Sequence, residues 1–290
     1  MDVDNFIGQA WTDHAADAAA VAARLQPLPP VTDEAHIVPL AHLAHHVLGQ
    51  HLGRWQDGIA LLQQLAALPC CPPQGDTPAA LRRFQDSLLL ATGDASINLS
   101  ETMAPSDRIR VTAMAAASLA AHDTARASAL LHGAAADFTS AGLSGEDVSA
   151  RALAANANNI AGALEEMSQR TPAQRNLMIA AAQMASRFWR QAGGWLEDER
   201  AEYRLALVWL QAGDVAQARQ HAQRCLDVVA KNQGPALEQF FGWVALGRVE
   251  RAAGNAESHA QAITEAQTAF AALAETDRAW CQVSLTALRS

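Results

Sequence analysis

The chain has 290 residues, of which 50% are hydrophobic but only 5% aromatic, and alanine is its commonest residue. Its formal net charge of −9 argues against nucleic acid as a partner, because phosphate binding relies on clustered Lys and Arg. The 21 basic residues include one lysine, Lys231, whose neighbours form neither a phosphate-binding loop nor a Ser-x-x-Lys pair. Composition therefore indicates a soluble, helix-rich protein and excludes several classes of enzyme.

The beginning of the chain, residues 1–5, is acidic and lacks the basic start and apolar stretch of a secretory signal. No apolar run approaches the roughly 20 residues that span a bilayer. The four cysteines are too few and too scattered for a disulfide framework. We therefore expect a cytoplasmic protein with reduced thiols and no membrane partner.

Long stretches of Ala, Leu, Arg, Gln and Glu favour helix throughout, and almost no segment alternates as a strand does. The clearest interruption is 68–76, which contains three prolines and a glycine. Capping residues indicate several helix starts: Thr77 precedes Pro78, and Thr171 with Gln174 forms a capping box. The predicted helices are 8–24, 38–52, 55–68, 78–92, 95–103, 107–121, 124–139, 146–169, 172–192, 195–212, 215–231, 235–253, 256–274 and 277–288.

Several helix junctions resemble one another. A glycine separates the two helices at four of them, and an Asp or Asn follows it at three; the glycines are Gly53, Gly93, Gly213 and Gly254. A fifth junction has His122 in the glycine's place, before Asp123. In the last unit Trp243, Leu246 and Gly247 precede the turn, and Ala266 follows it.

These features resemble the tetratricopeptide (TPR) repeat, most strongly over residues 195–275, although Gly53 and Gly93 are 40 residues apart and Gly213 and Gly254 are 41 apart, where the family uses 34. The resemblance implies an all-α fold, a TPR-like superhelix of antiparallel helix hairpins (an α-α solenoid). We expect a capping helix in 1–32, one continuous domain of repeats in 33–275 and a second capping helix in 276–290.

The resemblance also implies a concave groove that binds peptides. In TPR domains that grip a C-terminal carboxylate, an Asn on one groove helix cooperates with two basic residues on the next. Alignment by the turns places Asn159, Arg200 and Arg204 at such positions, whereas Thr112 and Ala116 occupy two positions where the family has Lys and Asn.

Asn156, Asn158 and Asn159 cluster in a helix although asparagine is a poor helix former, so a functional role is one reading of the cluster. We predict peptide-binding residues Asn156, Asn159, Arg200 and Arg204, with Trp195 and the pair Phe240 and Phe241 as further groove candidates. The alternative is that the arginines pair with acids of their own helix, namely Glu197, Glu199 or Glu202, while the asparagines cap carbonyls between helices.

Histidines form a second cluster around one predicted helix. His42 and His46 share a face, as metal ligands four residues apart would. Leucines and a valine on the same helix favour packing instead, so no metal site is predicted. The members of the cluster are His14, His36, His42, His45, His46 and His51.

No spacing typical of a catalytic motif is present, so we predict no catalytic residue and no cofactor. The sequence favours a non-enzymatic scaffold or adaptor that binds a protein or peptide segment with an acidic or C-terminal carboxylate group. Two alternatives stay open: a regulatory or self-associating helical scaffold, and a small-molecule or metal-dependent activity centred on residues 36–51. The oligomeric state is not predicted.

Overall fold

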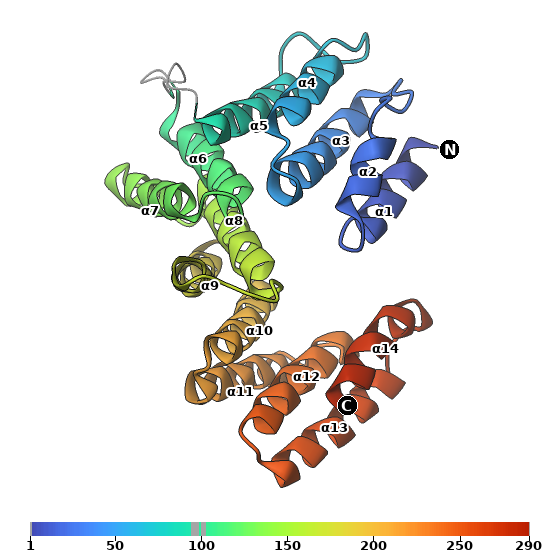
Figure 1. The fold of residues 1–290 in the computed structure, drawn as a ribbon, viewed down its shortest axis with the longest axis vertical. Helices are drawn as coiled ribbons and strands as arrows, with labels where there is room; N and C mark the ends of the chain where they lie inside the picture. Colours follow the sequence, from blue (N-terminus) through green and yellow to red (C-terminus); the bar gives the residue numbers. More distant parts are fainter. Residues whose placement is uncertain (1, 94–98, 100–102, 290) are drawn as a thin grey trace. The chain divides into compact units, whose positions relative to one another are not determined.

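The computed structural model describes residues 2–93, 99 and 103–289, and this part of the chain is all-α, with fourteen α-helices (Figure 1). The chain divides into two compact units, Met1–Leu143 and Ser144–Ser290. Successive helices pack as antiparallel pairs, as the sequence predicted. The predicted helix 95–103 lies outside the described residues except for residues 99 and 103. None of the described helices is long and apolar enough to cross a membrane.

In the first unit a hydrophobic core begins in the first helix and continues through the fifth. Leu40, Leu43, Leu48 and Leu88 are fully buried in this core. The elements of the unit are α1 (Val3–Asp13), α2 (Ala18–Arg24), η1 (Glu34–His36), α3 (Ile37–Ala44), η2 (His45–His51), α4 (Trp55–Ala66), α5 (Asp76–Thr92), α6 (Pro105–Leu119) and α7 (Thr124–Ser140).

The second unit contains three helix pairs and a final helix. Small residues line the close approaches between its helices: Ala218 and Ala266 are fully buried, and Gly247 faces Leu288 and Ala262. Its helices are α8 (Val148–Glu165), α9 (Pro172–Ala192), α10 (Trp195–Ala212), α11 (Val215–Lys231), α12 (Ala236–Ala252), α13 (Ala256–Ala271) and α14 (Glu275–Arg289).

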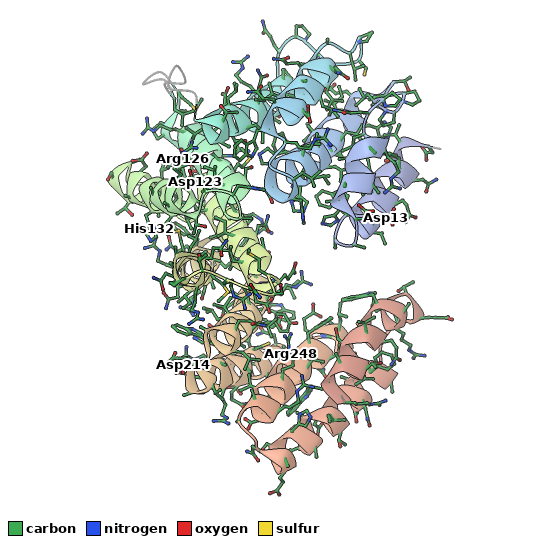
Figure 2. All side chains as sticks on the ribbon, viewed as in Figure 1. Asp13, Asp123, Arg126, His132, Asp214 and Arg248 are labelled. Atoms are coloured by element: carbon green, nitrogen blue, oxygen red, sulfur yellow. The ribbon has the colours of Figure 1, made fainter. Side chains whose placement is uncertain are left out.

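The junctions have the local chemistry that the repeats predicted. Gly213 and Gly254 end their helices with φ angles of 86° and 71°, a left-handed conformation that a side chain disfavours. The next residue then caps the following helix: the Asp214 side chain accepts a hydrogen bond from the backbone N–H of Gln217. Asp123 and Asp214 mark two such helix starts (Figure 2).

The capping box of Thr171 and Gln174 is confirmed, because each side chain accepts a hydrogen bond from the other residue's backbone N–H. The predicted cap at Thr77 is wrong. Helix α5 already begins at Asp76, and the Thr77 hydroxyl donates instead to the carboxylate of Glu34, 2.7 Å away. The Thr77 hydroxyl therefore makes a tertiary hydrogen bond instead of the helix cap that the local pattern predicted.

The predicted first helix, 8–24, is two helices. Helix α1 ends at Asp13, and α2 begins at Ala18 after Asp17, whose side chain accepts a hydrogen bond from the backbone N–H of Ala20. No glycine or proline marks this turn. The Asp17 cap is its signal in the sequence.

The predicted helix 38–52 also changes form partway along. From His45 the backbone is a π-helix, and the N–H of Leu52 donates to the carbonyl of Val47 five residues earlier, at 3.1 Å. Gly49 allows this segment to lie directly against α5, because a Cβ added there would lie 2.7 Å from Leu88 Cδ2. Because a π-helix has more residues per turn than an α-helix, the histidines from His45 to His51 are grouped on its faces differently from the α-helical prediction.

Candidate functional site

The second unit contains a cavity of about 460 Å³. Side chains from α8, α10, α12 and α14 line it, so four helices far apart in sequence form its walls. The lining residues are Asn158, Glu199, Arg200, Tyr203, Arg204, Leu237, Glu238, Phe241 and Trp280.

Aromatic rings form one wall of this cavity. The Phe241 and Trp280 rings stack with centroids 5.2 Å apart at 21°, and the Tyr203 ring meets Phe241 edge-on at 5.8 Å. Trp280 is 51% exposed, so part of its face is open to an incoming group. Among the aromatic candidates from the sequence, Phe241 lines this cavity, whereas Phe240 is fully buried in the core.

Both predicted arginines line the cavity, and each contacts a glutamate from another helix. Nη2 of Arg200 donates to Oε1 of Glu238 at 2.9 Å, and Nη1 of Arg204 donates to Oε2 of Glu165 at 3.2 Å. Both contacts join different helices, so they differ from the alternative prediction, in which the arginines pair with acids of their own helix. The Arg200 side chain is 62% exposed and so remains accessible to a ligand, whereas only 21% of the Arg204 side chain is exposed.

Glu199 lines the cavity with a carboxylate that is only partly satisfied. The residue is 2% exposed, its Oε1 accepts a hydrogen bond from the Cys225 thiol at 3.0 Å, and its Oε2 has no hydrogen-bond partner. The pKa of Glu199 is raised to about 7, mainly by burial and also by the nearby charge of Glu238, although the Cys225 hydrogen bond and the charge of Arg200 act to lower it. This carboxyl group is therefore partly protonated at neutral pH.

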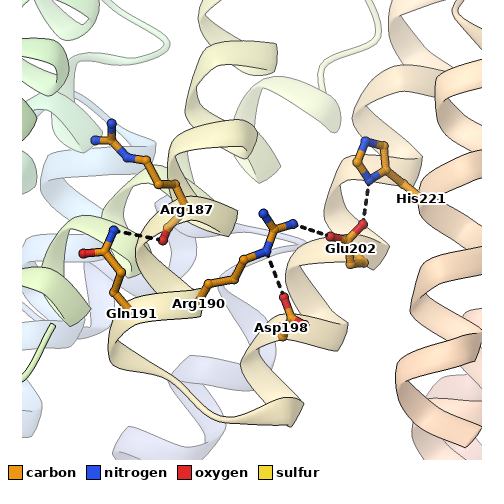
Figure 3. A network of polar contacts seen from close by, with 6 residues as sticks. All are labelled: Arg187, Arg190, Gln191, Asp198, Glu202 and His221. Atoms are coloured by element: carbon orange, nitrogen blue, oxygen red, sulfur yellow. Dashed lines mark hydrogen bonds and ion pairs between the residues drawn. The ribbon is translucent and has the colours of Figure 1, made fainter. Parts of the chain in front are cut away.

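Glu202, three residues later on α10, shows the opposite behaviour. Figure 3 shows its carboxylate between Arg190, whose Nη2 donates to it at 2.8 Å, and His221, whose Nδ1 lies 2.6 Å away. Burial acts to raise the pKa of Glu202, but the His221 and Arg190 contacts outweigh it and hold the pKa below its ordinary value. Arg190 also contacts Asp198 at 3.4 Å. Two buried acids one turn apart thus differ because only Glu202 has close side-chain contacts from Arg190 and His221.

The predicted asparagines do not share one position. Asn158 lines the cavity, whereas Asn156 and Asn159 are not among the residues that line it. The side-chain amide of Asn156 donates to the backbone carbonyl of Ala152 at 2.8 Å, within its own helix, and Asn159 is exposed. Thr112 lies in the first unit, where its hydroxyl donates to the carbonyl of Arg108.

A second cavity of about 590 Å³ adjoins the first, since Tyr203 and Arg204 line both. The second cavity is more polar than the first, and Arg248, labelled in Figure 2, contributes a further guanidinium to its lining.

The sequence analysis did not predict the acids that line the first cavity. Glu238 and Glu199 belong to charged helix faces that usually meet solvent, so their burial had no signal in the local pattern.

The histidine-rich segment lies in the first unit. The Leu43 and Val47 side chains are fully buried, as predicted for a packed helix. His45 is buried too and its Nε2 contacts the Ser87 hydroxyl at 2.8 Å. The His42 ring lies 5.2 Å from the Trp11 ring and stacks on Phe84 at 6.0 Å.

No protein-family model matches the chain, and no curated protein matches it. Among solved structures it resembles the crystal structure of BtubC (BKLC) from P. vanneervenii, with 15% sequence identity and a TM-score of 0.52. The match covers 93% of this chain and 89% of that chain. This likeness shows the fold, an all-α TPR-like arrangement of helix pairs.

Proposed function

We propose that this protein is a non-enzymatic scaffold that binds a protein or peptide segment in the cavity of its second unit. One observation carries the proposal. Oε2 of Glu199 is buried without a hydrogen-bond partner in a cavity that also presents exposed aromatic and guanidinium faces. A buried polar atom without a partner is costly, and a ligand that hydrogen-bonds to it would recover part of that cost.

The chemistry of the lining matches that of a peptide. Arg200 can hold a carboxylate with the donors that Glu238 does not use, because a guanidinium has five. The amide of Asn158 can pair with a backbone N–H or C=O group. Trp280, in the aromatic wall, can pack against an apolar side chain of the peptide, because an aromatic ring buries a large apolar area. In this proposal the carboxylate comes from an acidic side chain or a C-terminus, and Asn158 takes the role predicted for Asn156 and Asn159.

Peptide display on the full chain tests the proposal. Libraries with free and with blocked C-termini are selected, and enriched peptides are measured by fluorescence anisotropy. We expect Arg200→Ala and Trp280→Ala each to weaken binding by about tenfold or more, because each removes a charge-assisted contact or an aromatic anchor. Arg224→Ala, on the exposed face of α11, is the matched control and should bind as the wild type does.

Two results would contradict the proposal. One is that no peptide is enriched in either library. The other is that the enriched peptides bind both cavity variants as tightly as the control. Preference for free C-termini would identify a terminal carboxylate as the group that Arg200 holds, and equal selection of both libraries would identify an internal acidic side chain.

A further inference from the structure

Three histidines of the first unit converge although they are distant in sequence. His14 lies just after α1, while His46 and His51 lie in the π-helix η2. One ring nitrogen from each comes within 4.8 Å of the other two. The Nε2 atoms of His46 and His51 are 3.0 Å apart.

The backbone explains this convergence. His46 and His51 are five residues apart, a spacing that puts side chains on different faces of an α-helix but brings them much closer together on a π-helix, whose hydrogen bonds join residues i and i+5. The turn that carries His14 is fixed by Arg24 of α2, whose Nη2 donates to the carboxylate of Asp13 at 2.7 Å; Asp13 is labelled in Figure 2. The cluster thus depends on the π-helix and on a tertiary ion pair.

Hydrogen bonds set which nitrogen of each ring is available. Nδ1 of His14 lies 2.7 Å from the carbonyl oxygen of Trp11, and Nδ1 of His46 lies 2.8 Å from Oε1 of Gln50. Both oxygens only accept, so each Nδ1 carries the hydrogen and each Nε2 keeps its lone pair. His51 is exposed, so its own Nδ1 can take the proton and donate to water, which frees its Nε2 as well.

We propose that His14, His46 and His51 bind one divalent transition-metal ion, Zn²⁺, through their Nε2 atoms, with a fourth position left to water. Metal-binding histidines commonly donate their other ring N–H to a carbonyl or similar oxygen, as His14 and His46 do here. Three nitrogen ligands with an open fourth position suit zinc, which binds imidazole nitrogen at about 2.0–2.1 Å in tetrahedral geometry.

The side chains need only a small adjustment to close around the ion. Tetrahedral zinc places its nitrogen ligands about 3.3 Å from one another; the Nε2 atoms of His46 and His51 are already 3.0 Å apart, and one ring nitrogen of each of the three histidines lies within 4.8 Å of the other two. His42 shares a predicted helix face with His46 but is not part of this group; its ring packs against Trp11 and Phe84.

Calorimetry on the untagged full chain, first freed of metal by a chelator, tests the site. We expect one equivalent of Zn²⁺ to bind, and Co²⁺ to give the intense visible absorption of a tetrahedral complex. His51→Ala should weaken zinc binding by at least about 100-fold and abolish that absorption, while Gln50→Ala should weaken binding by about 10–100-fold because it removes the partner of His46 Nδ1. His51 is exposed, so its loss should leave the fold intact.

His132→Ala is the matched control, since this histidine is exposed on α7 of the same unit and its Nδ1 contacts only its own helix, at Ser128 (Figure 2). Wild-type zinc affinity in this variant supports the proposal. The proposal fails if the wild type binds no zinc, or if His51→Ala and the control bind it equally, because the ion would then occupy another place. The site lies in the first unit, so its failure would not affect the proposed peptide cavity of the second.

Discussion

Replacing Glu199 with glutamine should stabilise the protein above pH 7 and should stabilise it much less at pH 5. Burial raises the pKa of Glu199 from its ordinary 4.5 to about 7. Between these two values the folded chain binds more protons at this site than the unfolded chain does, so stability falls as the pH rises. This contribution is complete below pH 4.5 and is lost as the pH rises through 7.

The size of the effect follows from the two pKa values. Their difference of about 2.5 corresponds to about 3 kcal/mol, because one pKa unit equals about 1.36 kcal/mol. Glutamine keeps an oxygen for the Cys225 thiol but cannot ionise, so the variant avoids this cost. Water that enters the cavity would reduce the gain, so about 3 kcal/mol is an upper value.

Urea unfolding of wild type and Glu199→Gln at pH 5 and pH 8 measures the effect. The two units can unfold in separate transitions, so each transition is fitted by itself. The matched control is Glu166→Gln, an exposed acid at the end of α8, which should show no change between the two pH values. A free-energy difference between Glu199→Gln and wild type that is equal at pH 5 and pH 8 would refute the reasoning.

Two further predictions concern packing and thiols. Gly242→Ala should destabilise the chain by about 1–3 kcal/mol in urea unfolding, because the added Cβ would lie 2.7 Å from a Leu226 methyl group. Gly133→Ala is the comparison: this glycine has open space around it on α7, so the substitution should stabilise the chain by about 0.5–1 kcal/mol. Equal effects of the two substitutions on the free energy of unfolding would contradict the packing argument. Burial raises the pKa of the Cys225 thiol, so Cys225 should resist dithionitrobenzoate at pH 8 in the folded chain while the half-buried Cys70 reacts. Early labelling of Cys225 would contradict this prediction, because it would show that the thiol is accessible in the folded chain.

The sequence predicted most of the fold because helix boundaries depend on neighbouring residues. A left-handed glycine followed by a capping Asp could be predicted at Gly213 and Asp214, because the glycine conformation and the cap each depend on residues within one helical turn. Part of the candidate site was predicted in the same way: Arg200 belongs to a groove helix by its repeat position, and it lines the cavity. The alignment selected Asn159, whereas Asn158 lines the cavity, because neighbouring residues differ by a helix rotation that repeat alignment alone does not fix.

Only the tertiary structure decided which groups meet. Glu199 and Glu202 are both acids of one charged helix, and contacts with α9, α11 and α12 give them opposite pKa shifts. The approach of His14 to His51 likewise depends on a π-helix and on the packing of α1 and α2 near it. Local sequence determines where each helix begins and ends, because those forces act over a few residues. The partners of a side chain are set by packing between distant segments, which no local pattern contains.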